Sequence, residues 1–249
     1  MVCAHILSVI LLLLGFVKKW IFEIRQRLFA RYMTYAAVKY NLALKERKIA
    51  HLASLKDIVS ADPELKDKNQ IRILEIGAGS GTNFKFYPDG SQLIMLDIND
   101  KFEEKLIKNV REFPQLHLEQ YVVADAADMP EVADSSVDVV ISQYCLCSCN
   151  DVPRVLQEVR RVLMPGGKFY FLEHVLDKPG TWRRLVQKFL VYIGFWSFVS
   201  CGCSIAKETG TFIRDAGFSD LTLDHFYLDT KIHFVFHFTR PTIIGIATK

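Results

Sequence analysis

The sequence of 249 residues lacks a strong excess of charge of either sign. Lys and Arg number 31 and Asp and Glu 28, which gives a formal net charge of +3 at pH 7. Domains that bind nucleic acid usually carry a basic patch or stripe, and this sequence has no Lys/Arg run with interleaved aromatic residues. We therefore expect no nucleic-acid partner.

Cysteine pairs with the spacing C-x-x-C are also absent. The six cysteines are Cys3, Cys145, Cys147, Cys149, Cys201 and Cys203. A zinc ribbon or a thioredoxin-type dithiol would need the C-x-x-C spacing. Alternate residues of a strand point to opposite faces, which is poor geometry for a disulfide between near neighbours. We expect no metal site and reduced thiols, as in a cytosolic protein.

The sequence has no apolar run of the roughly 20 residues that a membrane-crossing helix needs. The run from Val2 to Val17 is shorter, and neither a positive start nor a small-residue cleavage site marks it as a signal peptide. Basic and aromatic residues alternate after it, as in a segment at the headgroup level. These residues are Lys18, Lys19, Trp20, Phe22, Arg25, Arg27, Phe29, Arg31, Tyr32 and Tyr35.

The position of these bases suggests how the chain is organised. Because positive charge marks the cytosolic side of a membrane segment, we expect residues 1–35 to form an uncleaved anchor with the rest of the chain in the cytosol. The anchor would be monotopic or barely spanning, with membrane lipids as a partner. The alternative is a buried core helix. Residues 36–70 predict a helix and a linker, and residues 71–249 the main domain.

What the sequence does contain is a glycine-rich turn after a short apolar run. Residues 71–76, which include Glu75, predict a buried parallel strand, and Gly77, Gly79 and Gly81 follow it. A strand, a glycine turn and a helix form the first unit of a nucleotide-binding α/β fold. The spacing is G-x-G-x-G and not the dinucleotide pattern G-x-G-x-x-G. The alternative is a tight turn that binds no ligand.

An acid follows the second predicted strand. Residues 93–96 form an apolar run that ends at Asp97, 20 positions after Gly77. At about this distance the fold places a carboxylate against ribose hydroxyls, because a carboxylate accepts two hydrogen bonds from neighbouring donors. The alternative role of Asp97 is a helix N-cap.

Two further segments, residues 118–123 and 137–142, predict the third and fourth strands. Asp125 follows the third strand, and its alternative role is that of a turn aspartate. Cys147 lies beyond the outer end of the fourth strand. Ligands of open α/β sheets bind outside the carboxyl ends of the strands, so both residues are expected to border the ligand.

The order of these features resembles the class I S-adenosylmethionine-dependent methyltransferases. The match includes the glycine turn, Asp97, the Ala-Asp pair at 124–125 and the Met-Pro-Gly-Gly turn at 164–167 before the fifth strand. The resemblance implies S-adenosylmethionine as cofactor, with Asp125 near the adenine amino group. It also implies an α/β, Rossmann-like fold with a mostly parallel seven-stranded sheet, an antiparallel last strand and helices on both faces. The implied cofactor-binding residues are Glu75, Gly77, Gly79, Gly81, Asp97 and Asp125.

Several stretches resemble a narrower group, the membrane-bound methyltransferase-like family seven, which are microsomal alkyl thiol S-methyltransferases. The resemblance implies methyl transfer to small lipophilic thiols at the cytosolic face of the endoplasmic reticulum membrane, with lipid droplets as a second location. Residues 143–145 and 224–239 depart from the family pattern and border the expected acceptor pocket. The matching stretches are residues 74–81, 83–88, 132–140, 146–148 and 161–174.

Thiol methylation requires mainly that a thiolate be positioned and kept ionised, because a thiolate is already a strong nucleophile. His174, after the fifth predicted strand, is a candidate base, and its alternative is a structural histidine. Cys147 is a second candidate, with packing as the alternative. Glu173 would orient His174 or cap the following turn. Residues 185–199 would cover the acceptor, or else form an amphipathic core helix.

Two other functions remain open at this point. One is a methyltransferase that acts on a carbon, oxygen or nitrogen of a lipid or quinone, since the motifs do not distinguish acceptors. The other is a membrane or lipid-droplet interaction protein that keeps the fold without turnover. The Phe- and His-rich segment 232–238 predicts either a strand or a loop that lines the pocket.

Overall fold

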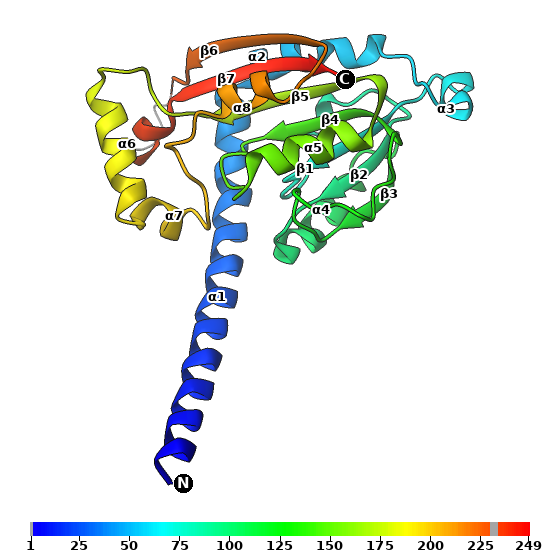
Figure 1. The fold of residues 1–249 in the computed structure, drawn as a ribbon. Coiled ribbons are helices and arrows are strands. Elements are labelled where there is room, and N and C mark those ends of the chain that lie inside the picture. Colours follow the sequence, from blue (N-terminus) through cyan, green and yellow to red (C-terminus); the bar gives the residue numbers. More distant parts are fainter. Residues whose placement is uncertain (1, 230–233) are drawn as a thin grey trace.

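A seven-stranded sheet forms the centre of the computed structural model (Figure 1). The structure describes residues 2–229 and 234–249, with side chains for 12–229 and 237–249. The strand order is β3-β2-β1-β4-β5-β7-β6, and all neighbours pair in parallel except β7, which is antiparallel to β5 and β6. The strands are β1 (Arg72–Ile76), β2 (Gln92–Leu96), β3 (His117–Val122), β4 (Val137–Gln143), β5 (Leu163–His174), β6 (Asp220–Tyr227) and β7 (Pro241–Thr248).

Helices cover both faces of this sheet, as predicted. Leu74 and Ile76 of β1 share a buried cluster with α5 and α8, whereas Ile73 shares another with α2 and α4. Successive residues of a strand point to opposite faces, so the apolar run of β1 supplies both clusters. The helices are α1 (Val2–Ala43), α2 (Lys45–Leu52), α3 (Pro63–Asp67), α4 (Glu103–Val110), α5 (Val152–Val162), α6 (Trp182–Tyr192), α7 (Phe195–Val199) and α8 (Thr209–Asp215).

The helix expected after the glycine turn is reduced to a short 3₁₀ helix, η2 (Phe84–Phe86). Tyr87 follows it in an extended conformation. The next residue is Pro88, and a proline disfavours the helical conformation of the residue before it. Pro88 therefore limits the length of the helix that follows the glycine turn.

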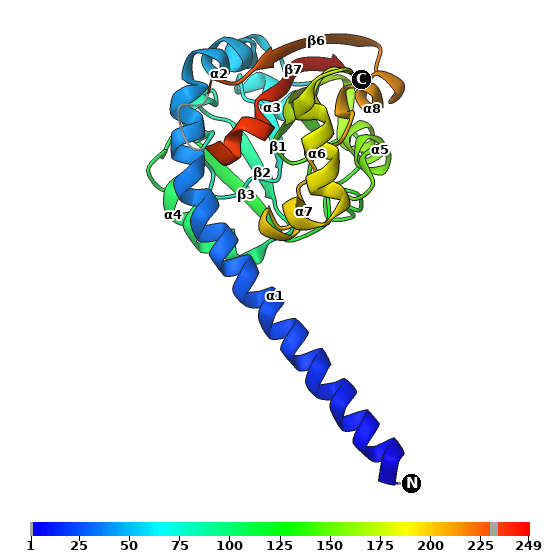
Figure 2. The ribbon, with the colours of Figure 1, turned by 90° about the vertical axis from the view of Figure 1, so that its left-hand side faces the viewer.

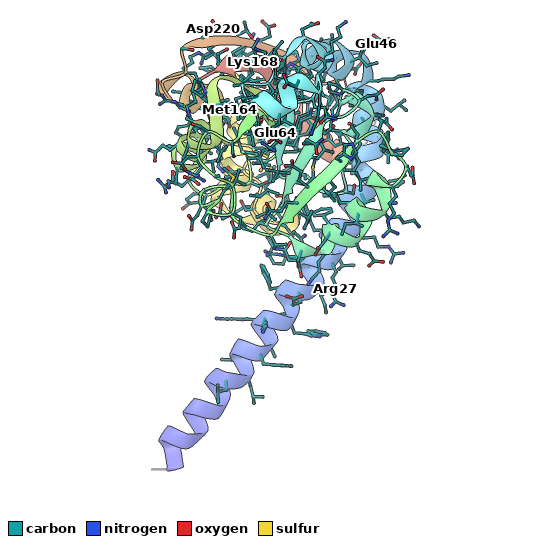
Figure 3. The ribbon with its side chains drawn as sticks, turned by 90° about the vertical axis from the view of Figure 1, so that its right-hand side faces the viewer. Arg27, Glu46, Glu64, Met164, Lys168 and Asp220 are labelled. Atoms are coloured by element: carbon teal, nitrogen blue, oxygen red, sulfur yellow. The ribbon has the colours of Figure 1, made fainter. Side chains whose placement is uncertain are left out.

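Helix α1 extends far beyond the rest of the molecule (Figures 1 and 2). Its 42 residues make it about 63 Å long at 1.5 Å per residue. It leaves the rest of the molecule near Arg27 (Figure 3). The side chains of residues 12–22 are exposed, and not buried as a core helix would have them. No helix within the described residues has both the length and the apolar character to cross a membrane.

The other end of α1 packs onto the domain. Ala36, Tyr40 and Leu44 share a buried cluster with Leu172 of β5 and with Leu228. This contact holds the helix beside the carboxyl ends of the central strands. The last turns of α1 therefore contribute side chains to the site described below.

The stretch predicted as a linker, residues 57–70, is fastened to the sheet. Ser60 Oγ donates to both carboxylate oxygens of Asp138 at 2.9 Å, and the backbone N–H groups of Ala61 and Arg72 donate to the same carboxylate. The short helix α3 follows, with Asp62 as its N-cap. The segments on both sides of residues 35 and 70 are thus packed against the domain. The proposed domain boundaries at these two positions stay a prediction.

Candidate active site

A cavity of about 600 Å³ lies at the carboxyl ends of β1, β2 and β4. The strand order reverses between β1 and β4, which is the place where open α/β sheets bind ligands. The turns that follow β1, β2 and β3 supply a mostly polar part of its wall. Helices α1 and α7 and the loop after β4 supply a mostly apolar, aromatic and sulfur-rich part.

The three glycines of the turn have different roles. All have positive φ, but a Cβ at Gly77 would lie 2.6 Å from Cys145 Cβ, and one at Gly81 would lie 2.3 Å from the ring of Phe84. A Cβ at Gly79 would meet no atom within 4 Å. Gly77 and Gly79 line the cavity, whereas Gly81 does not. Gly79 thus leaves the backbone open to a ligand. At position 81 only glycine fits, because a side chain would collide with the ring of Phe84. The predicted contact of Gly81 with the cofactor stays a prediction.

Asp97 lies in the cavity wall directly after β2. Its Oδ2 accepts a hydrogen bond from the backbone N–H of Gly79 and its Oδ1 one from that of Asn99, both at 2.9 Å. The N-cap of the following 3₁₀ helix is Asn99, so Asp97 does not play the alternative role of N-cap. Burial raises the pKa of Asp97 to about 6, against the two backbone hydrogen bonds. Each carboxylate oxygen keeps a lone pair for a further donor such as a ribose hydroxyl.

Asp125 also lines the cavity, on the loop after β3. Its Oδ1 accepts a hydrogen bond from the backbone N–H of Ala127 at 2.9 Å, which is the turn role considered from the sequence. Its side chain is otherwise exposed. The turn bond therefore fixes a carboxylate whose second oxygen remains free to meet a ligand amino group, and the adenine contact stays a prediction.

A buried polar network lies under the glycine turn. Glu75 accepts hydrogen bonds from Asn83 Nδ2 and from the Tyr87 hydroxyl, each at 2.5 Å. Lys48 Nζ donates to Asn83 Oδ1 at 2.9 Å and also to Asn41 Oδ1. Burial raises the pKa of Glu75 to about 7 and lowers the pKa of Lys48 to about 7. The sequence reasoning missed Lys48, which lies on α2, outside any motif.

These residues fit S-adenosylmethionine. Lys48 is the only Lys or Arg among the residues that the structure places in the cavity wall, and the cofactor has one anionic group, its carboxylate. Asp97 offers acceptors for two hydroxyls, and Gly79 lets the backbone approach closely. The cavity volume is within the range of small-molecule sites. Charge, hydrogen bonding and space thus agree with the predicted cofactor.

Five cysteines line the same cavity, and all five are free thiols. Cys147 Sγ lies 3.4 Å from Cys203 Sγ, and Cys145 Sγ lies 3.9 Å from Cys149 Sγ. The hydrogen bond between Cys147 and Cys203, together with burial, raises the pKa of Cys147, and the same hydrogen bond lowers the pKa of Cys203. The sequence identified Cys147 but missed Cys203, which reaches the cavity only because the loop after α7 folds back.

His174 lies in the wall as predicted, at the end of β5. Its ring stacks on Tyr144 with centroids 4.1 Å apart, and within the described residues its Nδ1 has no hydrogen-bond partner. Burial lowers the pKa of His174 to about 3, against a hydrogen bond with the backbone of Thr239. The imidazole is therefore neutral near pH 7. It is suited to accept a hydrogen bond but is a weak base.

Glu173 does not orient His174. Its Oε1 accepts from Ser142 Oγ at 2.6 Å and from the backbone N–H groups of Cys145 and Leu146 at 3.2 and 3.1 Å. It thereby fixes the loop after β4. The alternative prediction, that Glu173 caps the turn that follows it, is therefore also wrong. Tyr144 in this loop has a φ of 59°, a conformation that few residues other than glycine adopt.

No group of three or more His, Cys, Asp or Glu side chains in the described part of the chain is arranged to hold a metal ion. The segment expected as a strand or loop, residues 232–238, is described from residue 234, where a 3₁₀ helix (η4, Phe234–Thr239) begins, and residues 230–233 lie outside the described residues. Thr239, at the end of this helix, lines the cavity.

Comparisons with known proteins agree with this site. A family model for a methyltransferase domain matches residues 74–171. The human thiol S-methyltransferase TMT1A is 36% identical over 232 residues, which cover 93% of this chain and 87% of the relative. Human thiol S-methyltransferase TMT1B is 36% identical over 192 residues, 77% of this chain and 75% of the relative.

Among solved structures, an S-adenosylmethionine-dependent methyltransferase from Thermotoga maritima matches with a TM-score of 0.56. The match covers 89% of this chain and 98% of the other at 15% identity, so it shows the fold alone. The glycine turn, Asp97 and the sequence relatives together identify an S-adenosylmethionine-dependent enzyme. The chain is a class I methyltransferase, and it belongs to the family that contains the thiol S-methyltransferases TMT1A and TMT1B.

Proposed function

We propose that this methyltransferase transfers the methyl group to the sulfur of small lipophilic thiols. The observation that carries the proposal is the apolar half of the cavity, in a chain related over most of its length to thiol S-methyltransferases. An apolar wall binds an alkyl chain and offers few groups to hold a polar acceptor. The residues on this side include Phe29, Tyr32, Met33, Trp196 and Val199.

The bound cofactor supplies an electrophilic methyl group on a positively charged sulfur. The chain supplies position: Asp97 and Lys48 hold the two ends of the cofactor, and the apolar wall holds the acceptor in line. That wall also excludes water, so an acceptor thiolate is poorly solvated and reacts readily. Little further chemistry is required of the protein.

The proton of the acceptor thiol has two candidate partners in the wall. His174 Nδ1 can accept a hydrogen bond from the S–H group, but with a pKa of about 3 it takes up a proton poorly. Cys203 has a lowered pKa because Cys147 is its hydrogen-bond partner. The lowered pKa makes Cys203 a better proton acceptor near neutral pH than an ordinary thiol, so we assign the proton to Cys203 and the orientation of the thiol to His174.

We further propose that the enzyme lies on the cytosolic face of the endoplasmic reticulum membrane, with lipid droplets as a second location. Support comes from the exposed apolar and aromatic side chains of α1, such as Leu12, Phe16 and Trp20, next to Lys18 and Lys19. The choice of this particular membrane rests on the family resemblance.

The acceptor proposal is tested with short, water-soluble alkanethiols of increasing length and with the matching alcohols and amines. Each added CH₂ group that enters the apolar half contributes about 0.8 kcal/mol, so kcat/KM for thiols is expected to rise roughly four-fold per CH₂ group until the cavity is filled. Alcohols and amines are expected to give no product. Transfer to an alcohol or an amine would instead support the alternative of a methyltransferase that acts on oxygen or nitrogen.

The remaining possibility is a protein that keeps the fold but catalyses no methyl transfer. Calorimetric titration of the purified chain with S-adenosylmethionine tests this possibility. The intact Asp97 and the open Gly79 predict binding of S-adenosylmethionine by the purified chain. Binding without any methyl transfer would point to an acceptor outside the panel. Absence of binding would contradict the enzyme assignment itself.

A further inference from the structure

Helix α6 buries the polar side chain of Gln187 and exposes several large apolar side chains. Gln187 is fully buried: its Oε1 accepts from the backbone N–H of Asp177 at 2.9 Å, and its Nε2 donates to Phe238 O at 2.8 Å. Arg183, one turn earlier, donates to the carboxylate of Asp177 at 2.6 Å. Leu185 (71%), Phe189 (59%) and Tyr192 (88%) of the same helix are exposed, whereas Val186, Leu190 and Val191 are half-buried.

An ordinary amphipathic helix on a soluble domain buries its large apolar side chains. The hydrogen bonds of Gln187 and Arg183 fix the orientation of α6, so Leu185, Phe189 and Tyr192 are held outward by specific contacts. An apolar surface presented in this way marks an interaction site.

The exposed surface continues onto α7. The chain turns at Gly194, which has a φ of 71°, and α7 then directs Trp196 inward to the cavity. The other large residues around this turn are exposed. We define the docking face as Leu185, Phe189, Tyr192, Ile193, Phe195 and Phe198.

Helix α7 lies near the place where α1 leaves the rest of the molecule (Figures 1 and 2). Arg25 of α1 lies over the ring of Phe198, 5.3 Å from its centroid, and the Cys201 thiol donates to Arg25 O at 3.8 Å. Phe29 of α1 and Val199 of α7 both line the cavity. The part of the cavity wall that would receive the acceptor is thus built between two elements that expose apolar residues.

The charges around these elements favour an anionic lipid surface as the occupant. No Asp or Glu occurs between Lys178 and Lys207, and α6 carries Arg183, Arg184 and Lys188. Residues 12–35 of α1 have five bases and a single acid. Aromatic and apolar residues next to bases are typical of helices that lie in the interface of an anionic membrane. A second copy of the chain would bring like charges together.

We propose that α6 and α7 form a second membrane-docking element, which inserts into the headgroup region of an anionic bilayer on the same side as α1. The acceptor half of the cavity then faces the lipid, and acceptors dissolved in the bilayer reach it without passing through water. The proposal of membrane docking depends only on the exposed apolar residues and the charges around them. The entry of thiols from the bilayer depends in addition on the proposed function.

The docking is tested with one tryptophan as reporter in the full chain. The three natural tryptophans, Trp20, Trp182 and Trp196, are replaced by Phe, and Phe189→Trp is introduced. The control is Ile49→Trp in the same background, on α2 at the opposite end of the molecule (Figure 1). Vesicles of phosphatidylcholine and phosphatidylserine with brominated acyl chains serve as probe. We expect quenching and a blue shift at position 189 and neither at position 49.

Absence of quenching at position 189, in protein that floats with the vesicles, would overturn the proposal. The readout needs no acceptor, so failure of thiol methylation leaves it intact. A second measurement keeps the natural tryptophans and uses L185S/F189S, with I49S as the control. For L185S/F189S alone, KM should rise for a membrane-dissolved acceptor and stay unchanged for a water-soluble one.

Two outcomes of this second measurement contradict the proposal. In the first, L185S/F189S and the natural chain have the same KM for the membrane-dissolved acceptor as well as for the water-soluble one. The other is a dimer of the full chain in detergent that L185S/F189S abolishes, because the docking face would then be covered by a second copy.

Discussion

Cys147 and Cys203 lie side by side in the wall of the cavity, with their Sγ atoms 3.4 Å apart. The hydrogen bond between them raises the pKa of one thiol and lowers the pKa of the other. Cys203 is therefore the member of the pair that holds a thiolate more readily. The two thiols of the pair therefore differ in acidity, and they lie where the proposed acceptor sulfur would react.

Replacement of Cys147 by Ala should make Cys203 less reactive at a given pH. Alanine has no hydrogen-bonding group, so the hydrogen bond that lowers the pKa of Cys203 is lost. The alkylation of Cys203 by iodoacetamide, followed by mass spectrometry, should then require a higher pH. Cys149→Ala is the control, because Cys149 contacts Cys145. An alkylation profile identical to that of the natural chain would remove Cys147 as the cause.

His174→Ala should lower kcat with little change in the affinity for the cofactor. The substitution removes Nδ1 as hydrogen-bond acceptor and the ring that stacks on Tyr144, both on the acceptor side. His225→Ala, on β6 and away from the cavity, serves as the control. Full activity of His174→Ala would exclude His174 from the mechanism. Cys203→Ser tests the other proton partner in the same assay.

Asp97→Asn should weaken cofactor binding about ten-fold or more. The amide loses the negative charge, and a hydrogen bond to a charged group contributes about 1.5–3 kcal/mol. Asp128→Asn, on an exposed aspartate outside the cavity wall, is the control. Isothermal calorimetry measures the affinity, and an unchanged Kd would mean that the ribose assignment of Asp97 is wrong.

The same residue predicts a pH dependence. Burial raises the pKa of Asp97 to about 6, and hydroxyl donors prefer the ionised carboxylate. The part of the cofactor affinity that depends on Asp97 should therefore be fully present above pH 7 and should fall as the pH drops through 6 toward 5. In Asp97→Asn this decline should be smaller. An equal decline in both proteins would assign it to another group.

Lys48→Met should raise the Kd of S-adenosylmethionine about ten-fold, since a charged hydrogen bond to the carboxylate is lost. It also leaves Asn41 and Asn83 without their common donor, so thermal unfolding is measured in parallel. Lys85→Met is the matched control, because Lys85 is exposed and close in sequence to Asn83. Equal cofactor affinity of both variants would contradict the role of Lys48.

The parts of the site that the sequence predicted are local. The glycine turn and Asp97 follow strands whose apolar runs are unmistakable, and their spacing is set by the short connection from β1 to β2. The shortened helix before Pro88 follows from the restriction on a residue that precedes proline. These features need no knowledge of how distant segments pack.

The parts that the sequence missed depend on packing between distant segments. Lys48 meets Asn83 across 35 residues, and Cys203 meets Cys147 across 56. The low pKa of His174 results from burial, which a single sequence does not reveal. The periodicity of α6 predicts an amphipathic helix, but the hydrogen bonds of Gln187 decide which side faces out.

The most direct test of the central claim is the fate of a deuterated methyl group. The full chain in vesicles receives S-adenosylmethionine with a deuterated methyl group and an equimolar mixture of dodecanethiol, dodecanol and dodecylamine. Mass spectrometry of the products should find the label on the sulfur of the thiol alone, and Asp97→Ala should strongly reduce it. Label on the alcohol or the amine, or no label on the thiol while the cofactor binds tightly, would contradict thiol methylation as the function of this protein.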